Sequence, residues 1–135
     1  WNRRWKRPMN NALGLLGIAR RAGKLALGDE QCSIAVRDRK ARALFTAQDA
    51  AERAKSWAKS TGVPYLPLPI TKAELGALTG RASVAQVAVL DVGIAAAVAQ
   101  KLAAVDAQYA EAAETLAASA LRAARRKEKK KARKG

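Results

Sequence analysis

The chain has 135 residues, of which 50% are hydrophobic, enough for one domain with its own core and too few for two domains of ordinary size. Its formal net charge is +15, with basic residues gathered at both ends, which favours a polyanion as partner without specifying which one. The single cysteine excludes an intrachain disulfide and favours a reducing, cytoplasmic location. No apolar run approaches the ~20 residues that span a bilayer and no signal peptide is recognisable, so we expect no membrane partner.

The first eight residues form a basic segment. Trp1 and Trp5 alternate there with arginines and a lysine, a pattern that suits stacking on unpaired bases and equally fits an extension without function. Because Met9 is the only methionine, we expect the ordinary start of the protein at Met9 and interpret residues 1–8 as an N-terminal extension.

Helical and strand patterns alternate after this segment. Apolar residues recur at i, i+3 and i+4 over residues 10–22, which predicts an amphipathic helix that ends at Gly23. A short apolar strand, Leu25–Leu27, follows. A second helix is expected over residues 29–40, with Cys32 buried as a small apolar residue.

The middle of the chain continues the alternation. Residues 42–47 are typical of a short buried strand. Asp49 is expected to cap a third helix, with Glu52 three residues later as in a capping box, and Trp57 is expected in the core. The prolines in residues 63–68 favour an edge strand.

A second capping box is predicted further along. Thr71 and Glu74 have the required spacing at the start of a short helix. Residues 84–90 are the most strand-like run, and Asp91 is placed to cap the helix after it. The alternation predicts one α/β domain over residues 9–105 with a largely covered sheet.

From residue 106 onward the composition changes to alanine and then to lysine. Residues 106–120 keep helical spacing and predict a further helix, whereas residues 125–134 have no apolar face. We expect this basic tail to be disordered in isolation or ordered only on a polyanion. It either contacts RNA or only solubilises the protein, and we favour contact because its like charges otherwise repel one another. The tail residues expected to touch RNA are Arg122, Arg125, Arg126, Lys127, Lys129, Lys130 and Lys131.

The residues available for catalysis are few. The chain has no histidine, no serine in a nucleophile-elbow context and no cluster of metal ligands. Helix capping accounts for Glu52, Glu74 and Asp91. We therefore expect no enzyme, no catalytic residue, no metal, no cofactor and no small-molecule substrate.

The turn at Gly28 is the strongest candidate binding site. Glycine permits a backbone turn closed to bulkier residues, and the free N–H groups of the following helix attract anions. Glu30 and Gln31 can accept hydrogen bonds from the amino groups of bases, although Asp29 and Glu30 also suit an ordinary helix start. The cations close by in sequence are Arg20, Arg21 and Lys24.

Several stretches in order resemble the ribosomal protein L7Ae/L30e family, in particular its small bacterial members. They span about residues 9–102 and read LGLLGIARRAGKLALGDEQ, RALFTAQDA, YLPLP with TKAELGALTG, and VAVLDVGIAAAV. The resemblance implies a three-layer α/β/α sandwich with a mixed four-stranded sheet. It also implies binding to kink-turn RNA, a sharply bent internal loop with tandem sheared G·A pairs, by a ribosomal or ribosome-associated protein.

The resemblance also assigns roles to individual positions. The family's turn glycine falls on Gly28, and the residues that read the G·A pairs fall on Glu30 and Gln31. The loop that packs against an extruded base falls on about residues 80–85, with Val84 as its apolar contact. The full set of implied RNA-binding residues is Arg20, Arg21, Lys24, Gly28, Asp29, Glu30, Gln31, Gly80, Arg81 and Val84.

This chain departs from the family pattern at two positions. Ile34 stands where many members have a lysine, and Glu30 stands where archaeal members have an asparagine, which bears on kink-turn affinity. Arg81 either compensates by contacting a phosphate or is simply solvated. Two alternatives stay open: a ribosomal component held mainly by its basic tail, and a protein-interaction adaptor that docks through the helix over residues 106–120.

Overall fold

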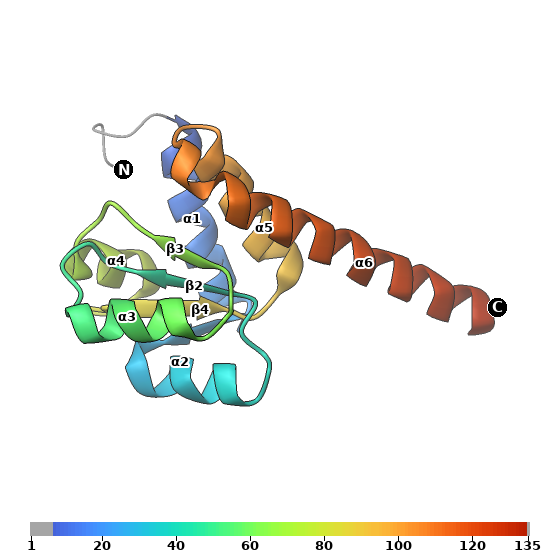
Figure 1. The fold of residues 1–135 in the computed structure, drawn as a ribbon, viewed down its shortest axis with the longest axis horizontal. Helices are drawn as coiled ribbons and strands as arrows, with labels where there is room; N and C mark the ends of the chain where they lie inside the picture. The colour runs from blue at the N-terminus through green and yellow to red at the C-terminus, as the bar shows by residue number, and fades with distance from the viewer. Residues whose placement is uncertain (1–6, 135) are drawn as a thin grey trace.

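The computed structural model describes residues 7–134, with only the backbone of Lys134, and shows an α/β domain from which a long helix extends (Figure 1). Trp1, Trp5 and the cations between them lie outside the described residues. The elements are α1 (Arg7–Arg21), β1 (Leu25–Leu27), α2 (Gly28–Arg37), β2 (Ala43–Thr46), α3 (Glu52–Ser60), β3 (Tyr65–Pro67), α4 (Lys72–Thr79), β4 (Gln86–Val89), α5 (Val92–Ala103), a 3₁₀ turn η1 (Ala107–Tyr109) and α6 (Ala110–Lys134).

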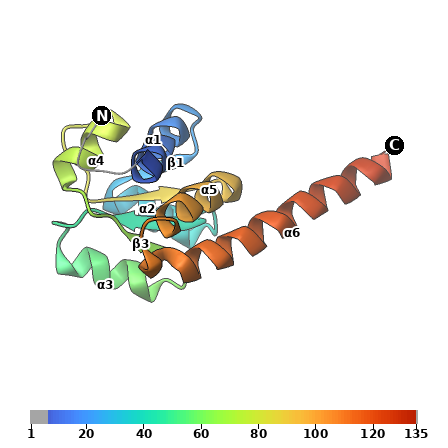
Figure 2. The same ribbon diagram turned by 90° about the horizontal axis from the view of Figure 1, so that it is seen from above.

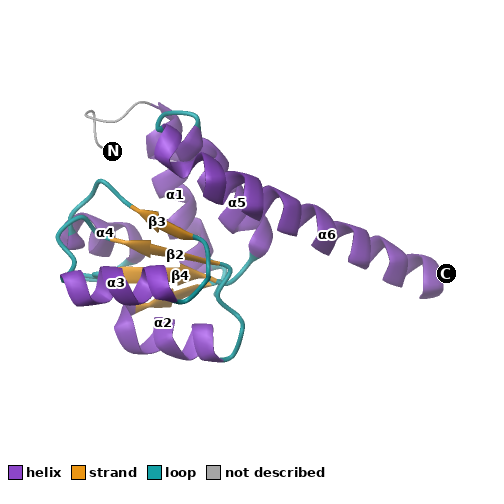
Figure 3. Ribbon diagram, in the orientation of Figure 1, coloured by secondary structure: helices purple, strands orange, loops and turns teal. Residues whose placement is uncertain are grey.

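The four strands form one mixed sheet in the order β1-β4-β2-β3 (Figure 3). Strand β4 runs antiparallel to both of its neighbours, β1 and β2, whereas β2 and β3 are parallel. The proline-containing strand β3 lies at an edge, as predicted, because a proline there removes a donor that no further strand needs. The predicted mixed four-stranded α/β fold is confirmed.

The sheet is covered on both faces because its residues alternate. Phe45 and Val87 point into a large core shared with α1, α4 and α5, while their neighbours Leu44 and Ala88 pack into a smaller core with α2 and α3. The smaller core contains Cys32, Ala35 and Ala58, and its small side chains bring the helices close to the strands. The sheet and the helices on its two faces form three layers. Within them, β1 follows the end of α1 and leads directly into the start of α2.

Two predicted helix caps are confirmed. The Thr71 hydroxyl accepts a hydrogen bond from the Glu74 N–H (3.1 Å), and the Glu74 carboxylate accepts one from the Thr71 N–H (3.0 Å), which completes the capping box of α4. The Asp91 carboxylate accepts from the Ile94 N–H (2.9 Å) at the start of α5. Each cap satisfies N–H groups that the first helical turn leaves unpaired.

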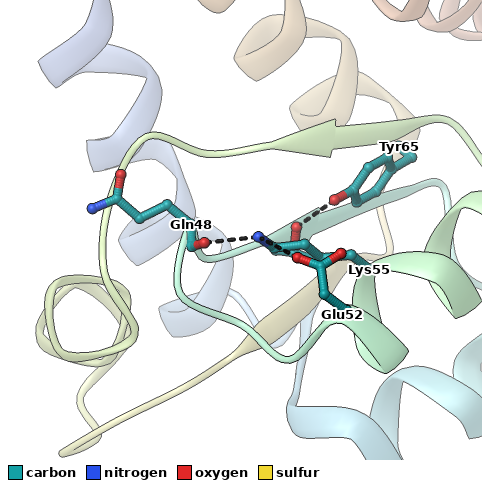
Figure 4. Close-up of polar contacts among 5 residues, drawn as sticks. Gln48, Glu52, Lys55 and Tyr65 are labelled. Carbon is teal, nitrogen blue, oxygen red and sulfur yellow. Dashed lines mark hydrogen bonds and ion pairs between the residues drawn. The ribbon is translucent and has the colours of Figure 1, made fainter.

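The predicted cap of the third helix is wrong. The Asp49 carboxylate accepts a hydrogen bond from the Lys72 N–H (2.7 Å), at the start of α4, and α3 begins at Glu52 without a side-chain cap. Glu52 instead pairs with Lys55 at 3.7 Å, and the Lys55 ammonium donates to the Gln48 carbonyl (2.8 Å, Figure 4). Asp49 therefore links the loop after β2 to α4, a contact between segments that sequence spacing does not reveal.

Trp57 is half-buried, contrary to the prediction of a core position. Helix α3 turns its alanines Ala54 and Ala58 to the sheet, and these are 8% and 0% exposed. The indole lies at the border of this contact, packed against the smaller core. Nearby, a hydrogen bond of 2.7 Å between the Thr46 and Tyr65 hydroxyls joins β2 to β3, and Figure 4 labels the Tyr65 side chain.

The C-terminal segment is a continuous helix, so the prediction of a disordered tail over residues 125–134 is wrong for this structure. Its alanines, lysines and arginines all have high helix propensity, which lets the helix continue without a packed face. The apolar stripe near its beginning, Tyr109, Ala113 and Leu116, is buried in the larger core. A protein-interaction adaptor that docks through residues 106–120 would need this stripe to be exposed, but the domain itself covers it.

The predicted boundaries also shift at α1 and α2. Arg7 and Pro8 belong to α1, and Met9 is 7% exposed, so the helix includes part of the expected extension. Helix α2 ends at Arg37, earlier than predicted, because the Asp38 N–H closes the last turn and Arg39 takes a left-handed conformation (φ 58°). Neither shift changes the order of the elements.

Candidate nucleic-acid interface

The turn between β1 and α2 leaves the first N–H groups of α2 without a side-chain cap. Gly28 has φ +87°, a left-handed conformation that disfavours side-chain-bearing residues. The N-cap residue Leu27 is extended and makes no side-chain cap, in contrast to the caps at Thr71 and Asp91. The first-turn N–H groups of α2 are therefore not satisfied by an N-cap side chain, and Glu30 and Gln31 are exposed beside them.

The loop over residues 80–85 lies next to this turn. In the antiparallel pairing of β1 and β4, Leu27 is opposite Val87, so the loop that enters β4 meets the turn that leaves β1. Gly80 takes a left-handed conformation (φ +79°) at the end of α4, and the Arg81 N–H donates to the Gly76 carbonyl (2.8 Å). The structure thus brings together the two segments that the resemblance assigns to RNA.

Gly76, which was not among the predicted site residues, lets this loop pass close to α4. A Cβ atom on Gly76 would lie 2.7 Å from the Arg81 carbonyl oxygen and 2.8 Å from the Ser83 nitrogen. Both are backbone atoms, so the loop would have to move to admit any side chain. The signal in the sequence is a glycine inside a predicted helix, which often marks a close approach.

Val84 does not offer an apolar surface, contrary to expectation. It is 5% exposed and packs in the larger core, and its N–H donates to the Lys72 carbonyl (3.0 Å). Arg81 is exposed in the same loop, together with Ala82 and Ser83. The loop therefore presents a cation and small side chains instead of a branched apolar one.

The three cations predicted near the turn lie at the other end of β1. Lys24 precedes the strand, where its carbonyl accepts from the Leu90 N–H (2.8 Å), and Arg20 and Arg21 end α1. The step from Lys24 to Gly28 spans about 13 Å at ~3.3 Å per extended residue. All three side chains are exposed, and they lie at the opposite end of β1 from Glu30 and Gln31.

Two polar residues that the sequence analysis did not single out lie beside the turn. The Gln86 amide donates to the Asp29 carboxylate at 3.0 Å, which ties the first turn of α2 to β4. Arg53 of α3 lines a pocket of about 300 Å³ together with Asp29, Gln86 and Trp57. These contacts join three elements that are distant in sequence, so only the strand pairing could have indicated them.

Cys32 and Ile34 lie further along α2. Cys32 is buried, as predicted, and its thiol donates to the Ala26 carbonyl (3.7 Å). Burial, and secondarily the Asp29 carboxylate, raises the pKa of the Cys32 thiol to about 12. Ile34 is half-buried and supplies no charge where many family members have a lysine.

The second half of α6 forms a separate cationic surface. Figures 1 and 2 show this half of the helix extending away from the domain. Over residues 122–133 the only acidic side chain is Glu128. The predicted tail residues that lie on it, all exposed, are Arg122, Arg125, Arg126, Lys127, Lys129, Lys130 and Lys131.

Within residues 7–134, no helix combines the length and hydrophobicity needed to cross a bilayer.

The chain is similar to three known proteins and matches one family model. A curated relative from Enterococcus faecium, "RNA-binding protein YlxQ", is 41% identical over 54 residues, which are 40% of this chain and 52% of the relative. The chain thus spans about half the length of that relative. A solved structure of a protein with unknown function from Bacillus halodurans C is similar with a TM-score of 0.62 and 26% identity, over 67% of this chain and 95% of that one.

A second solved structure, the Giardia lamblia 15.5kD RNA binding protein, has a TM-score of 0.58 at 18% identity, over 76% of this chain and 92% of that one. At this identity it supports the fold alone. The family model that describes the "Ribosomal protein L7Ae/L30e/S12e/Gadd45 family" matches residues 10–99, from within α1 to within α5. The chain therefore belongs to the ribosomal protein L7Ae/L30e/S12e/Gadd45 family.

Proposed function

We propose that this protein binds RNA and recognises a kink-turn through the Gly28 turn and the loop over residues 80–85. The observation that carries the proposal is the open start of α2, where uncapped N–H groups and the exposed Glu30 and Gln31 lie beside that loop. The curated relative is named as an RNA-binding protein, and the large positive charge suits a phosphate backbone. As a binding protein it needs no catalytic group and would act in the cytoplasm.

Each part of this surface has a distinct chemical task. The carboxylate of Glu30 and the amide oxygen of Gln31 accept hydrogen bonds from exocyclic amino groups, which read bases. The first-turn N–H groups of α2 and the guanidinium of Arg81 are donors that suit phosphate oxygens. Specific recognition and backbone binding therefore come from neighbouring residues on two segments.

The cations at the start of β1 offer a second place for phosphates of a kinked RNA. A kink brings phosphates of two RNA helices close together, where they repel one another. Lys24, about 13 Å from Gly28 at ~3.3 Å per extended residue, and Arg20 and Arg21 at the end of α1 would reach phosphates other than those at Gly28. Binding would then stabilise the bent RNA over the extended one, as a population shift without chemistry.

The test compares a kink-turn RNA with the same RNA lacking its G·A pairs. We expect markedly weaker binding of the altered RNA, measured as Kd at fixed salt. Glu30→Ala should reduce this discrimination, whereas Glu114→Ala, an exposed glutamate on α6, should leave it unchanged. Equal affinity of the unaltered protein for both RNAs would overturn kink-turn recognition and leave only RNA electrostatics.

The extended half of α6 favours a second candidate function. Because it carries a cationic surface away from the domain, the protein would be a ribosomal component held mainly by this helix. Removal of residues 122–135 would then abolish co-sedimentation with ribosomes, while Glu30→Ala would not. The reverse pattern would support the kink-turn surface as the main attachment.

A further inference from the structure

A pocket between α2 and α3 lies beside the proposed RNA surface and is not explained by it. It has a volume of about 300 Å³ and is lined by Asp29 and Ser33 of α2, by Arg53, Ala54 and Trp57 of α3, and by Gln86 of β4. This volume is at the lower end of the ~300–1,000 Å³ range of small-ligand pockets. The pocket is separate from residues 80–85, none of which line it.

The side-chain amide of Gln86, which lines this pocket, is buried and is only partly hydrogen-bonded among the described residues. The residue is 1% exposed, and its Nε2 donates to the Asp29 Oδ1 at 3.0 Å. Since an ionised carboxylate only accepts hydrogen bonds, this contact fixes the amide orientation, with the nitrogen toward Asp29. The other amide atom, Oε1, is buried and has no hydrogen-bond partner among the described residues. A buried carbonyl without a partner costs free energy that a donor from a ligand would recover.

The remaining lining residues indicate what kind of donor fits. Trp57 supplies an aromatic side chain that is only half-buried, a surface on which a planar ring can stack. Arg53 supplies a cation that can hold a phosphate attached to that ring. The Asp29 carboxylate adds a second acceptor next to Gln86, so a group with two N–H donors suits the pair better than a group with one.

We propose that this pocket binds a nucleobase that carries an exocyclic amino group, stacked on Trp57 and donating to the Oε1 of Gln86. Adenine, cytosine and guanine all carry such an amino group. Uracil presents a single N3–H flanked by two carbonyl oxygens, which the Asp29 carboxylate repels. The base comes either from an unpaired nucleotide of the bound RNA, a source that rests on the proposed function, or from a free nucleotide, a source that does not.

The first experiment uses free nucleotides as probes of the full-length protein. AMP, CMP and UMP are titrated while NMR follows the side-chain amide of Gln86 and the indole N–H of Trp57. We expect saturable shifts with AMP and CMP and a Kd for UMP at least about fivefold higher, the lower limit for one well-placed base contact. Equal Kd values for the three nucleotides, or no shift at either group with any of them and no effect in the RNA experiment below, would overturn the proposal.

Variants separate binding from folding. Gln86→Met removes the acceptor at similar size, and Ser33→Phe fills the pocket from an exposed position. Both should weaken AMP binding at least about fivefold, whereas Gln100→Met, an exposed glutamine on α5, should not. If Gln86→Met lowers the unfolding temperature, Ser33→Phe still decides, because it leaves the core intact. AMP binding that both variants retain would contradict the assignment.

The RNA experiment distinguishes the two sources of the base. If the base comes from RNA, Gln86→Met and replacement of one unpaired RNA nucleotide by an abasic site should each weaken RNA binding, and the two changes together should weaken it no further. If the base comes from a free nucleotide, AMP still binds while RNA affinity is unchanged in Gln86→Met. Glu30→Ala keeps AMP binding in either case, so a failure of kink-turn recognition leaves the pocket result readable.

Discussion

Single residues control the shape of the proposed surface in two different ways. Gly28 needs its left-handed backbone, and a Cβ atom there would meet nothing within 4 Å. Gly76 has an ordinary helical backbone but lacks space, because the loop of residues 81–83 passes directly over it. The first glycine is required for a conformation, and the second for a close contact.

Replacement of Gly76 should displace the loop. We expect Gly76→Ala to lower the free energy of unfolding by about 1–3 kcal/mol, as overpacking against backbone does. Urea unfolding measures this loss, and shifts of the Arg81 amide signal report the moved loop. The matched control is Gly14→Ala in α1, where a Cβ atom meets nothing within 4 Å and the higher helix propensity of alanine should stabilise by up to ~1 kcal/mol. Equal effects of the two changes would contradict a steric role for Gly76.

The buried thiol of Cys32 should make stability depend on alkaline pH. The folded protein holds this thiol protonated to a pKa of about 12, above the ordinary value of 9.0, so the stability it contributes is complete below pH 9. That contribution is lost as the pH rises from 9 toward 12, because the unfolded chain then releases a proton that the folded chain keeps. Burial likewise raises the pKa of Tyr109 to about 12.

The measurement is urea unfolding at pH 7, 9 and 10.5. Cys32→Ala should lower stability at every pH but reduce the fall between pH 9 and 10.5, and Tyr109 should contribute to the fall that remains. An unchanged fall in Cys32→Ala would show that the thiol does not titrate differently in the two states.

At the scale of elements, α6 has two halves with different surroundings. Ala113 and Leu116 are 7% and 2% exposed in the larger core. The hydroxyl of Tyr109, which directly precedes α6, donates to the Pro67 carbonyl. Beyond Leu121, which is 53% exposed, the helix carries cations and extends away from the domain. The first half therefore belongs to the fold, and the second half is available to a partner.

Truncation should separate these halves. Removal of residues 122–135 should change the free energy of unfolding by less than about 0.5 kcal/mol, because none of the side chains over residues 122–133 is buried. Leu116→Ala should cost about 2–5 kcal/mol, since it empties a core position. Thermal and urea unfolding of both variants checks this. A truncated protein destabilised as much as Leu116→Ala would mean that the cationic half packs on the domain.

Across the described part of the molecule, residues 7–134, exposed cations near β1 and on α6 are both available to a polyanion. Arg20, Arg21 and Lys24 lie on the domain, and the α6 cations extend from it. Each phosphate contact releases counterions, so the number of contacts is measurable from the salt dependence of the affinity.

We therefore expect the affinity for RNA to fall linearly on a log–log plot against salt, with a slope of about −0.7 to −0.9 per contacted phosphate. Removing residues 122–135 and replacing the three domain cations by alanine should each make the slope shallower, and the two changes should add. The slope is measured by titration at several salt concentrations. An identical slope for the truncated protein would show that α6 does not touch RNA.

The sequence by itself determined the local features of this protein. The bounds of β1, the capping box at Thr71 and the cap at Asp91 depend on residues within a few positions of one another, and each is confirmed. The order of strands and helices follows from hydrophobic periodicity, and family resemblance supplied the mixed sheet.

Only the tertiary structure decided the contacts between distant segments. Asp49 reaches α4 instead of capping α3, Val84 packs inward, and Gln86 bonds to Asp29 across β1 and β4. It also decided that the cations of α1 and the Gly28 turn lie at opposite ends of β1. The physical reason is that a hydrogen-bond cap forms within one turn of chain, whereas the partner of a buried group depends on which strands pair and in which register.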